Sequence, residues 1–325
     1  MELFREILSI DSTSGREREL ALWLCDHLES PSRKVMEVGD GTLNLLFCWG
    51  SPKVVFCTHM DTVPPYIPCS YADGLWRGRG TCDAKGQIFS MYSACKALEA
   101  AGASGFGLLL LSGEETGSHG AKAFSRTGFQ APYLIVGEPT ENKMVSAGKG
   151  TKSFGLCFKG EPFHSGYPQY GLSAVSLFNE FCNDLKKAEF PLDPLLGETT
   201  WNIGQLRSDN PQNVLSAQLE CRIYFRTTFA SDKPVTEYMA SLPEYIGVTP
   251  FGGDTPAEYF TLPSFQSAPV AFGSDAPHLT GFAHKAICGP GSIKVAHRDD
   301  ECISCEDLRT ATDQYVKMFQ EINRL

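Results

Sequence analysis

Five residues of metal-binding type are spread along this sequence: His59, Asp83, Glu115, Glu138 and His297. The set combines carboxylates with imidazoles and contains no thiolate, a mixture that suits Zn²⁺, Co²⁺ or Mn²⁺. A catalytic zinc usually takes three protein ligands and leaves one position open. Five candidates therefore predict two divalent ions about 3.5–4 Å apart, with one carboxylate bridging them. Zinc is the metal we expect first, with cobalt or manganese as alternatives.

Asp83 lies in the glycine-rich stretch Gly78-Arg79-Gly80-Thr81-Cys82-Asp83-Ala84-Lys85-Gly86. Glycines permit backbone angles that other residues resist. An Asp on such a turn can hold its carboxylate away from its own backbone and bind a metal with each oxygen. Most glycine-rich turns are only turns, so the prediction depends on the neighbouring candidates.

Two acidic residues next to the candidate ligands, Asp61 and Glu114, have predicted roles other than metal binding. Asp61 follows His59 by two positions, which places both side chains on the same side of a strand. A metal-bound His usually donates its other ring proton to an oxygen acceptor such as a carboxylate, and Asp61 is the predicted acceptor. In the pair Glu114-Glu115 adjacent side chains point in different directions, so one can bind metal while the other stays free as a base.

The candidates follow segments that alternate between strand and helix. Short apolar runs at 54–57, 107–111 and 133–136 read as buried strands, with helices expected at about 87–101 and after Ser118. Leu43, Leu45 and Phe47 alternate with other residues, as a half-buried strand would. This order predicts a mostly parallel sheet with helices on both sides. Ligands of such sheets bind beyond the carboxyl ends of the strands, where His59, Glu115 and Glu138 fall.

The pattern changes near Lys149, and a separate small unit is expected from there. Strands at 153–159, 200–205 and 217–226, with helices at 174–187 and 234–241, predict an inserted α+β domain over 150–248. Buried strands return at 269–272 and 286–288, and a last helix is expected over 304–324. The predicted fold is α/β, with a catalytic domain over 1–149 and 249–325 and a lid over 150–248.

Composition excludes several classes of protein. The chain has 325 residues, of which 42% are hydrophobic, and a net charge of −10. No dense Lys/Arg cluster offers a nucleic-acid surface, and no apolar run is long enough to span a membrane. The acidic start lacks the basic and apolar regions of a signal peptide, so we expect a cytoplasmic location.

Several segments, in order along nearly the whole chain, resemble the zinc-dependent amidohydrolase family of acetylornithine deacetylase, succinyl-diaminopimelate desuccinylase, carboxypeptidase G2 and the aminoacylases. They are His59-Met60-Asp61-Thr62-Val63-Pro64, the Gly78–Gly86 stretch, Gly113-Glu114-Glu115-Thr116-Gly117, Gly137-Glu138-Pro139-Thr140, His164-Ser165-Gly166-Tyr167-Pro168, and His297 with Asp299-Asp300-Glu301. The closing segment departs from the commoner family form, which has Asn before Glu.

The resemblance implies a role for each residue of the set. Asp83 would bridge two ions and form a cis peptide bond with Ala84. His59 and Glu138 would hold one ion, and Glu115 and His297 the other. Glu114 would be the general base, and His164 on the lid the donor to the oxyanion. The substrate-binding positions implied in the same way are Asn213, Arg222 and Ser274.

The resemblance also implies a reaction, the metal-dependent hydrolysis of the amide bond of an N-acyl amino acid. A deacetylase of arginine biosynthesis, active as a homodimer through the lid, is the reading we expect first. A dipeptidase, aminopeptidase or carboxypeptidase of the same fold is the nearest alternative. A metal-binding protein without activity is the other, and the presence of Glu114 and His164 argues against it.

Overall fold

The chain divides into two compact units. The computed structural model describes residues 1–39 and 41–325. Unit 1 comprises Met1–Ser146, Tyr259–Ala268 and Ser274–Leu325, and unit 2 comprises Ala147–Glu258 and Pro269–Gly273. The predicted insertion 150–248 lies inside unit 2. Unit 2 extends further because β12 (Ile246–Gly252) pairs with β9 over most of its length, beyond residue 248.

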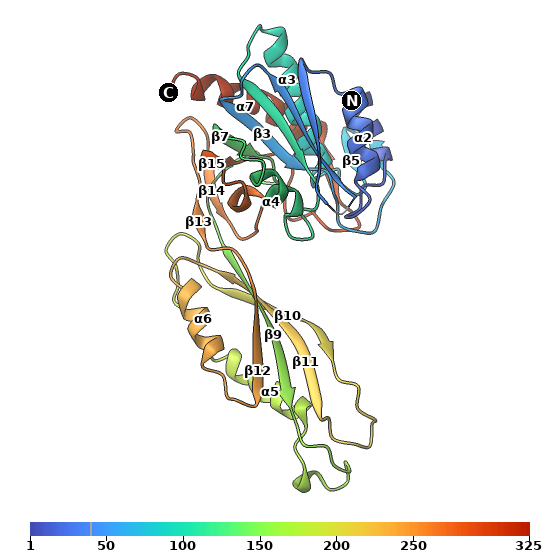
Figure 1. Cartoon of the computed structure of the whole chain (residues 1–325), viewed down its shortest axis with the longest axis vertical. Coiled ribbons are helices and arrows are strands. Elements are labelled where there is room, and N and C mark those ends of the chain that lie inside the picture. Colours follow the sequence, from blue (N-terminus) through green and yellow to red (C-terminus); the bar gives the residue numbers. More distant parts are fainter. Residues whose placement is uncertain (40) are drawn as a thin grey trace. The chain divides into compact units, whose positions relative to one another are not determined.

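Unit 1 is built on a six-stranded sheet in the order β1-β2-β6-β3-β7-β15 (Figure 1). Strand β3 is parallel to β6 and β7, and β15 is parallel to β7, whereas β1 and β2 run antiparallel at one side. The predicted mostly parallel α/β sheet is therefore confirmed. The strands are β1 (Ser32–Glu37), β2 (Leu43–Trp49), β3 (Val54–His59), β6 (Phe106–Leu111), β7 (Ala131–Val136) and β15 (Phe282–Ile287).

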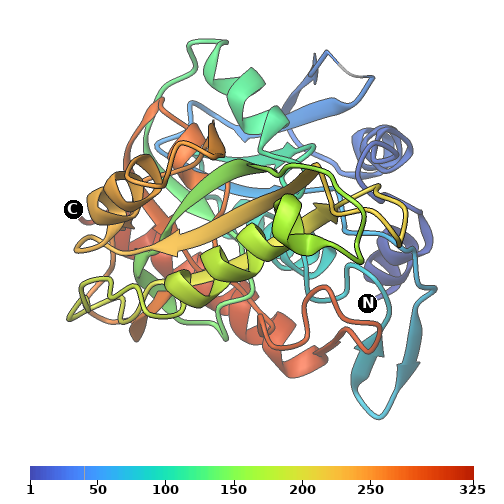
Figure 2. The same ribbon diagram turned by 90° about the horizontal axis from the view of Figure 1, so that it is seen from below.

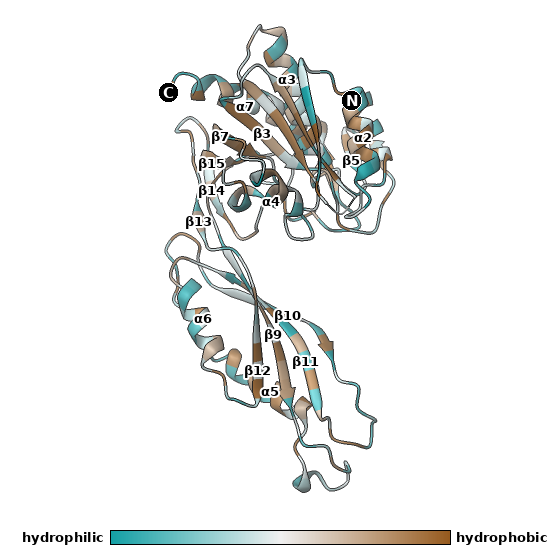
Figure 3. Cartoon of the chain, in the orientation of Figure 1, coloured by the Kyte–Doolittle hydropathy of each residue, from teal (hydrophilic) through white to brown (hydrophobic). Residues whose placement is uncertain are grey.

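The central strands are apolar on both faces because helices cover the sheet (Figure 3). Phe56 and Leu108 are register partners and fully buried, and such side chains each contribute about 1.5–3 kcal/mol by leaving water. Helices α3 and α7 contact each other, and residues of both belong to this core. The helices of unit 1 are α1 (Glu2–Ser9), α2 (Arg18–His27), α3 (Lys85–Ala100), α4 (His119–Ser125), the short η2 (Ala276–His278) and α7 (Cys305–Ile322).

Two strand predictions were wrong in part. Strand β2 is buried on both faces rather than one, because α2 and α4 both contact it. The segment predicted as a buried strand at 269–272 is instead the end of β14 (Ser267–Val270), which is partly exposed. Pro269 lacks a backbone N–H, which restricts it to an edge of a sheet. β14 accordingly lies at the edge of a separate three-stranded sheet.

Two small sheets complete the topology. One has the order β13-β8-β14, and the boundary between the two units falls within its strands β8 and β14. The other has the order β16-β5-β4 and belongs to unit 1. The remaining strands are β4 (Ser70–Ala72), β5 (Leu75–Arg77), β8 (Met144–Gly148), β13 (Ala257–Glu258) and β16 (Cys302–Ser304).

Unit 2 is a four-stranded antiparallel sheet with two helices on one face (Figures 1 and 2). Its order is β10-β11-β9-β12, and alternate residues of β11 are buried and exposed, as a sheet covered on one side requires. Phe158, Leu177 and Phe225 belong to the core between sheet and helices. The elements are β9 (Gly150–Lys159), η1 (Pro168–Tyr170), α5 (Ala174–Leu185), β10 (Thr200–Arg207), β11 (Gln218–Thr227), α6 (Asp232–Ala240) and β12.

No helix among the described residues is both long and apolar enough to cross a membrane.

Candidate metal centre

Three of the predicted ligands follow the carboxyl ends of neighbouring parallel strands. His59 is the last residue of β3 and is the register partner of Leu111, the last residue of β6. Glu115 follows β6 by a short turn, and Glu138 comes two residues after the end of β7. Because β3 lies between β6 and β7, the loop that begins at His59 lies between the loop of Glu115 and the loop of Glu138.

Asp83 lies between the two histidines, which approach different oxygens of its carboxylate. Oδ1 of Asp83 is 3.0 Å from Nε2 of His59, and Oδ2 is 3.4 Å from Nε2 of His297. The Asp83–Ala84 peptide bond is cis, as the family resemblance implies. A carboxylate that faces a different imidazole with each oxygen has the arrangement expected of a bridging ligand.

Glu115 completes a cluster with His59 and Asp83. The ligand atoms of these three residues all lie within 4.8 Å of one another. His297 joins them because its Nε2 is 2.9 Å from Oε1 of Glu115. His59 and Asp83 are buried, whereas about half of the His297 side chain is exposed.

Glu138 is buried with no hydrogen-bond partner for Oε1 among the described residues. Burial raises the pKa of Glu138 well above its ordinary value, and the neighbouring charges of Glu114 and Asp83 raise it further. An unpaired carboxylate oxygen in the interior is costly unless a proton or a cation compensates it. The donor set and this orphaned oxygen both fit divalent cations.

In the metal-free protein, burial and the neighbouring charges shift the pKa values of this cluster in opposite directions. Burial alone would raise the pKa of Asp83, but hydrogen bonds with His297 and His59 outweigh it and lower that pKa. Burial alone would lower the pKa of His59, but the carboxylates of Asp61 and Asp83 raise it well above its ordinary value. Hydrogen bonds with Asp83 and Glu115 raise the pKa of His297 to about 10.

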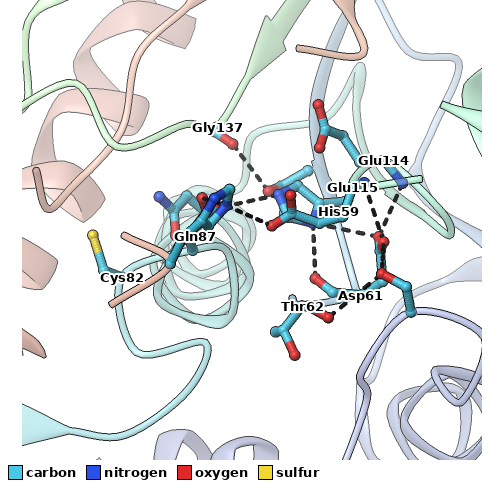
Figure 4. Close-up of polar contacts among 12 residues, drawn as sticks. His59, Asp61, Thr62, Cys82, Gln87, Glu114, Glu115 and Gly137 are labelled. Carbon is cyan, nitrogen blue, oxygen red and sulfur yellow. Dashed lines mark hydrogen bonds and ion pairs between the residues drawn. The ribbon is translucent and has the colours of Figure 1, made fainter. Parts of the chain in front are cut away.

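Asp61 holds the turn that carries the tandem glutamates (Figure 4). Its Oδ1 accepts the backbone N–H of Glu114 at 3.0 Å, and its Oδ2 accepts that of Glu115 at 3.2 Å. The hydroxyl of Ser14 donates to the same Oδ2 at 2.9 Å. Nδ1 of His59 lies 3.5 Å from the Asp61 carboxylate but 2.9 Å from the Asp61 backbone carbonyl. The backbone oxygen is thus the closer acceptor for His59, and the carboxylate mainly positions the turn.

Asn44 also fixes this loop, at its two ends. Its side-chain oxygen accepts the Ser112 N–H at 3.1 Å, and its amide donates to the Gly120 carbonyl at 2.8 Å. A Cβ at position 120 would collide with the Ser112 carbonyl oxygen, so only glycine lets the two ends of the loop approach. The loop from 112 to 120 is therefore closed at its base, and Glu114 and Glu115 lie within it.

Glu114 has the environment of a base rather than a surface carboxylate. Burial raises the pKa of Glu114 well above its ordinary value, although the charge of His59 partly offsets this. The charges of Asp275 and Glu115 raise it further. Asp275 was missed by the sequence analysis, which selected its neighbour Ser274. Asp275 is buried, which raises its pKa to about 6, whereas the Ser274 hydroxyl accepts the Ala276 N–H within its own turn.

In unit 2 the predicted oxyanion donor is an exposed histidine on a short turn. Nδ1 of His164 accepts the backbone N–H of Gly166 at 3.0 Å, so the proton of the neutral ring lies on Nε2. The Ser165 N–H donates to the Asn213 carbonyl at 2.9 Å, which brings the predicted residues His164 and Asn213 together.

Arg222 lies on the open face of the unit 2 sheet, in contact with an aromatic ring. Its guanidinium carbon is 3.7 Å from the centre of the Phe251 ring. Its register partners on both neighbouring strands are glycines, Gly155 and Gly204. A Cβ at Gly155 would come within 2.7 Å of the Phe251 ring. The glycine leaves room for that ring, and a cavity of about 480 Å³ lined by Arg222 and Phe251 opens on this face.

Comparison with known proteins places the chain in a family. The model of Peptidase family M20/M25/M40 matches residues 55–321. The fold and site define a metal-dependent hydrolase, and the chain belongs to this peptidase family.

Individual relatives agree with that assignment. The chain is 30% identical over 381 residues to a probable carboxypeptidase of Aspergillus fumigatus, covering 98% of this chain and 86% of that protein. A Staphylococcus aureus tripeptidase shares the fold, with a TM-score of 0.81, 18% identity, and 99% of this chain and 97% of that chain covered. A Bacillus subtilis protein described as a dinuclear metal-binding peptidase of the M20 family superposes with a TM-score of 0.70 at 12% identity, covering 98% and 95% of the two chains. These findings support the family, and they favour a peptidase over the acetylornithine deacetylase expected first.

Proposed function

We propose that this protein is a metal-dependent carboxypeptidase or dipeptidase that hydrolyses the C-terminal peptide bond of a small peptide. The observation that carries the substrate class is Arg222, whose guanidinium lies against Phe251 at the edge of a cavity. A guanidinium binds a carboxylate through two parallel hydrogen bonds, which suits the free carboxylate of a peptide terminus. The similarity to a fungal protein named as a probable carboxypeptidase supports the same reading.

Five residues would hold two divalent cations in this proposal. His59 and Glu138 would bind one, Glu115 and His297 the other, and Asp83 both. Two bound cations would lower the pKa of a water molecule to about 7 and polarise the scissile carbonyl. Zinc remains the metal we expect first, with cobalt and manganese as alternatives.

Glu114 would move the protons of the reaction. Its backbone N–H donates to Oδ1 of Asp61, which positions Glu114 within the strand-end turn. It would accept a proton from the attacking water and deliver it to the leaving amine. His164 would donate from Nε2 to the oxyanion that forms on the carbonyl oxygen, because its Nδ1 is already occupied by the Gly166 N–H.

The hydrolysis of N-acyl amino acids is the second candidate. An N-acyl amino acid also places a free carboxylate beside an amide bond, so Arg222 would serve either substrate. The two candidates differ only in what lies on the acyl side, an aminoacyl residue or an acetyl group. Asn213 would contribute to the same substrate site, and a homodimer through unit 2 and a cytoplasmic location complete the proposal.

Matched substrates test the proposal. For each residue X, the zinc-loaded, cobalt-loaded and manganese-loaded enzyme would be assayed with Gly-X, N-acetyl-Gly-X, Gly-X amide and N-acetyl-X. We expect cleavage of substrates with a free C-terminal carboxylate and little cleavage of Gly-X amide. Cleavage of N-acetyl-Gly-X would identify a carboxypeptidase, and its absence a dipeptidase. Preferred cleavage of N-acetyl-X would favour the deacylase, and efficient cleavage of Gly-X amide would contradict the role of Arg222.

A further inference from the structure

One buried carboxylate joins two segments that carry candidate metal ligands. Glu301 is fully buried, four residues after His297. Its Oε1 accepts two backbone N–H groups of the glycine-rich turn, that of Cys82 at 2.9 Å and that of Asp83 at 3.0 Å. The amide of Asp83 is thus fixed by a side chain from the segment that contains His297.

The second oxygen of Glu301 is paired with a buried arginine. Nη1 of Arg79 donates to Oε2 of Glu301 at 2.7 Å, and Arg79 is only 2% exposed. The same nitrogen donates to the carbonyl of Arg298 at 3.0 Å, and Nε donates to the carbonyl of Pro65 at 3.3 Å. One guanidinium therefore contacts the backbone next to His297 as well as the carboxylate that holds Asp83.

Stability alone is a weak reason for this pair. Removing two charges from water costs several kcal/mol per ion, and apolar replacements of similar volume are often as stable. The pair instead satisfies backbone groups at the two places where ligand geometry is set. His297 has a φ of +64°, a left-handed conformation that is uncommon for residues other than glycine. The hydrogen bond from Nη1 of Arg79 to the carbonyl of Arg298, the residue after His297, holds the backbone in that conformation.

We propose that Arg79 and Glu301 are positioning residues that set the separation between Asp83 and His297 before any metal arrives. Glu301 orients the turn of Asp83, and Arg79 ties the His297 segment to it. Without the pair, Nε2 of His297 would no longer be held 3.4 Å from Asp83 and 2.9 Å from Glu115. This inference rests on the metal centre proposed above.

Arg79→Lys is the principal test. Lysine keeps a positive charge beside Glu301, so the variant avoids an unpaired buried carboxylate. It cannot span the carbonyls of Pro65 and Arg298 at the same time, because it has one compact ammonium group in place of the planar fork. We expect Zn²⁺ affinity, measured by calorimetry on metal-free protein, to fall about 10–100-fold, the usual range for groups that orient metal ligands. The visible absorption of the Co²⁺-loaded variant should also change, because that spectrum reports coordination geometry.

Asp300→Asn is the matched control. Asp300 is adjacent to Glu301 but exposed, and it pairs with the Arg298 side chain at 2.7 Å. Its removal should leave the Zn²⁺ affinity and the Co²⁺ spectrum as in the wild type. Arg79→Met combined with Glu301→Gln gives a second variant without an unpaired charge, and it should show weakened binding like Arg79→Lys.

The outcomes separate this inference from the proposed function. Wild-type protein that binds no divalent cation would overturn the metal centre and, with it, the inference. Wild-type binding together with unchanged affinity and spectrum in folded Arg79→Lys would overturn the inference alone. A lower melting temperature with unchanged affinity would show that the pair is only structural. An equal loss in Asp300→Asn would show that the effect is not specific to the buried pair.

Discussion

Unit 1 and unit 2 hold their functional candidates in different ways. In unit 1 the candidate ligands His59 and Asp83 are buried, and backbone groups, histidines and carboxylates hold them in place. In unit 2 His164 and Arg222 are exposed; Nδ1 of His164 accepts the Gly166 N–H, and the Arg222 guanidinium lies against the Phe251 ring. A preorganised cluster binds metal without rearrangement, whereas exposed residues can meet a substrate as it arrives. Variants of unit 1 should therefore change metal binding or chemistry, and variants of unit 2 should leave the metals in place.

The largest effect is expected within unit 1, at the tandem glutamates. Glu114→Gln should retain both metals while kcat falls about 10²–10⁴-fold, the usual contribution of a general base. Glu115→Ala should instead lose bound metal, because it removes one member of the His59–Asp83–Glu115 cluster. Steady-state kinetics and elemental analysis of both variants would check this. Exchanged phenotypes would mean that the two glutamates have the opposite roles.

His164→Ala is the corresponding test in unit 2. It should keep both metals and a similar KM but lower kcat about 10²–10³-fold, the range for removing one oxyanion donor. If His164 acts across a homodimer, mixing this variant with Glu114→Gln should restore part of the activity. Such a hybrid dimer would contain one site with both groups intact. No recovery after proven subunit exchange would contradict the crossed arrangement.

Arg222→Met should weaken the use of substrates that carry a free C-terminal carboxylate. The loss in kcat/KM should be about 10–100-fold, because a hydrogen bond to a charged group contributes about 1.5–3 kcal/mol. The preference for Gly-X over Gly-X amide should disappear in the variant. Phe251→Leu, which removes only the ring beneath the guanidinium, should show the same trend with a smaller loss. An unchanged preference in Arg222→Met would place the carboxylate elsewhere.

The smallest effect concerns pH and the metal-free protein. The pKa of His297 is about 10 in the folded chain, against an ordinary value of 6.5. A raised pKa means that His297 contributes stability that is fully present below pH 6.5 and is lost as pH rises through about 10. Denaturant titrations of metal-free protein should show this decline, and it should be weaker in His297→Ala.

Burial lowers the pKa of Lys85 to about 8, which makes the stability rise with pH between about 8 and 10.5. Only the difference in stability between the wild type and His297→Ala is therefore informative. The difference will be modest because His297 is half-exposed.

The parts of the fold that depend on local pattern could be predicted from the sequence. Continuous apolar runs predicted β3, β6 and β7, and the residues that follow these runs were predicted as candidate ligands. The second buried face of β2 was missed because Asn44 is polar, although Leu46 and Cys48 on the same face are apolar. The Asn44 side chain is buried, with hydrogen bonds to residues that are distant in sequence, Ser112 and Gly120. Likewise Glu301 is a charged residue in an acidic run, and only the folded chain shows it against Asp83.

Residues whose role depends on tertiary contacts could not be identified from the local sequence pattern. Gly155 interrupts a strand pattern, which indicates close approach of another group, but not that this group is Phe251. The apolar segment at 269–272 resembled a buried strand by composition, and Pro269 was the signal against it. Asp275 and Ser274 are neighbours on one turn and both are buried, but only the folded chain shows that the charge of Asp275 raises the pKa of Glu114.

The order of the strands sets the spacing of three candidate ligands, His59, Glu115 and Glu138. Neighbouring strands lie about 4.8 Å apart through their backbone hydrogen bonds, whatever side chains they carry. Strand β3 lies between β6 and β7, so His59 begins one such spacing from the loop of Glu115 and one from the loop of Glu138. No ligand substitution alters that interval. In the proposed centre, exchanging a side chain at this edge would change which cation is bound and how tightly, but the backbone spacing between these three strand ends would stay the same.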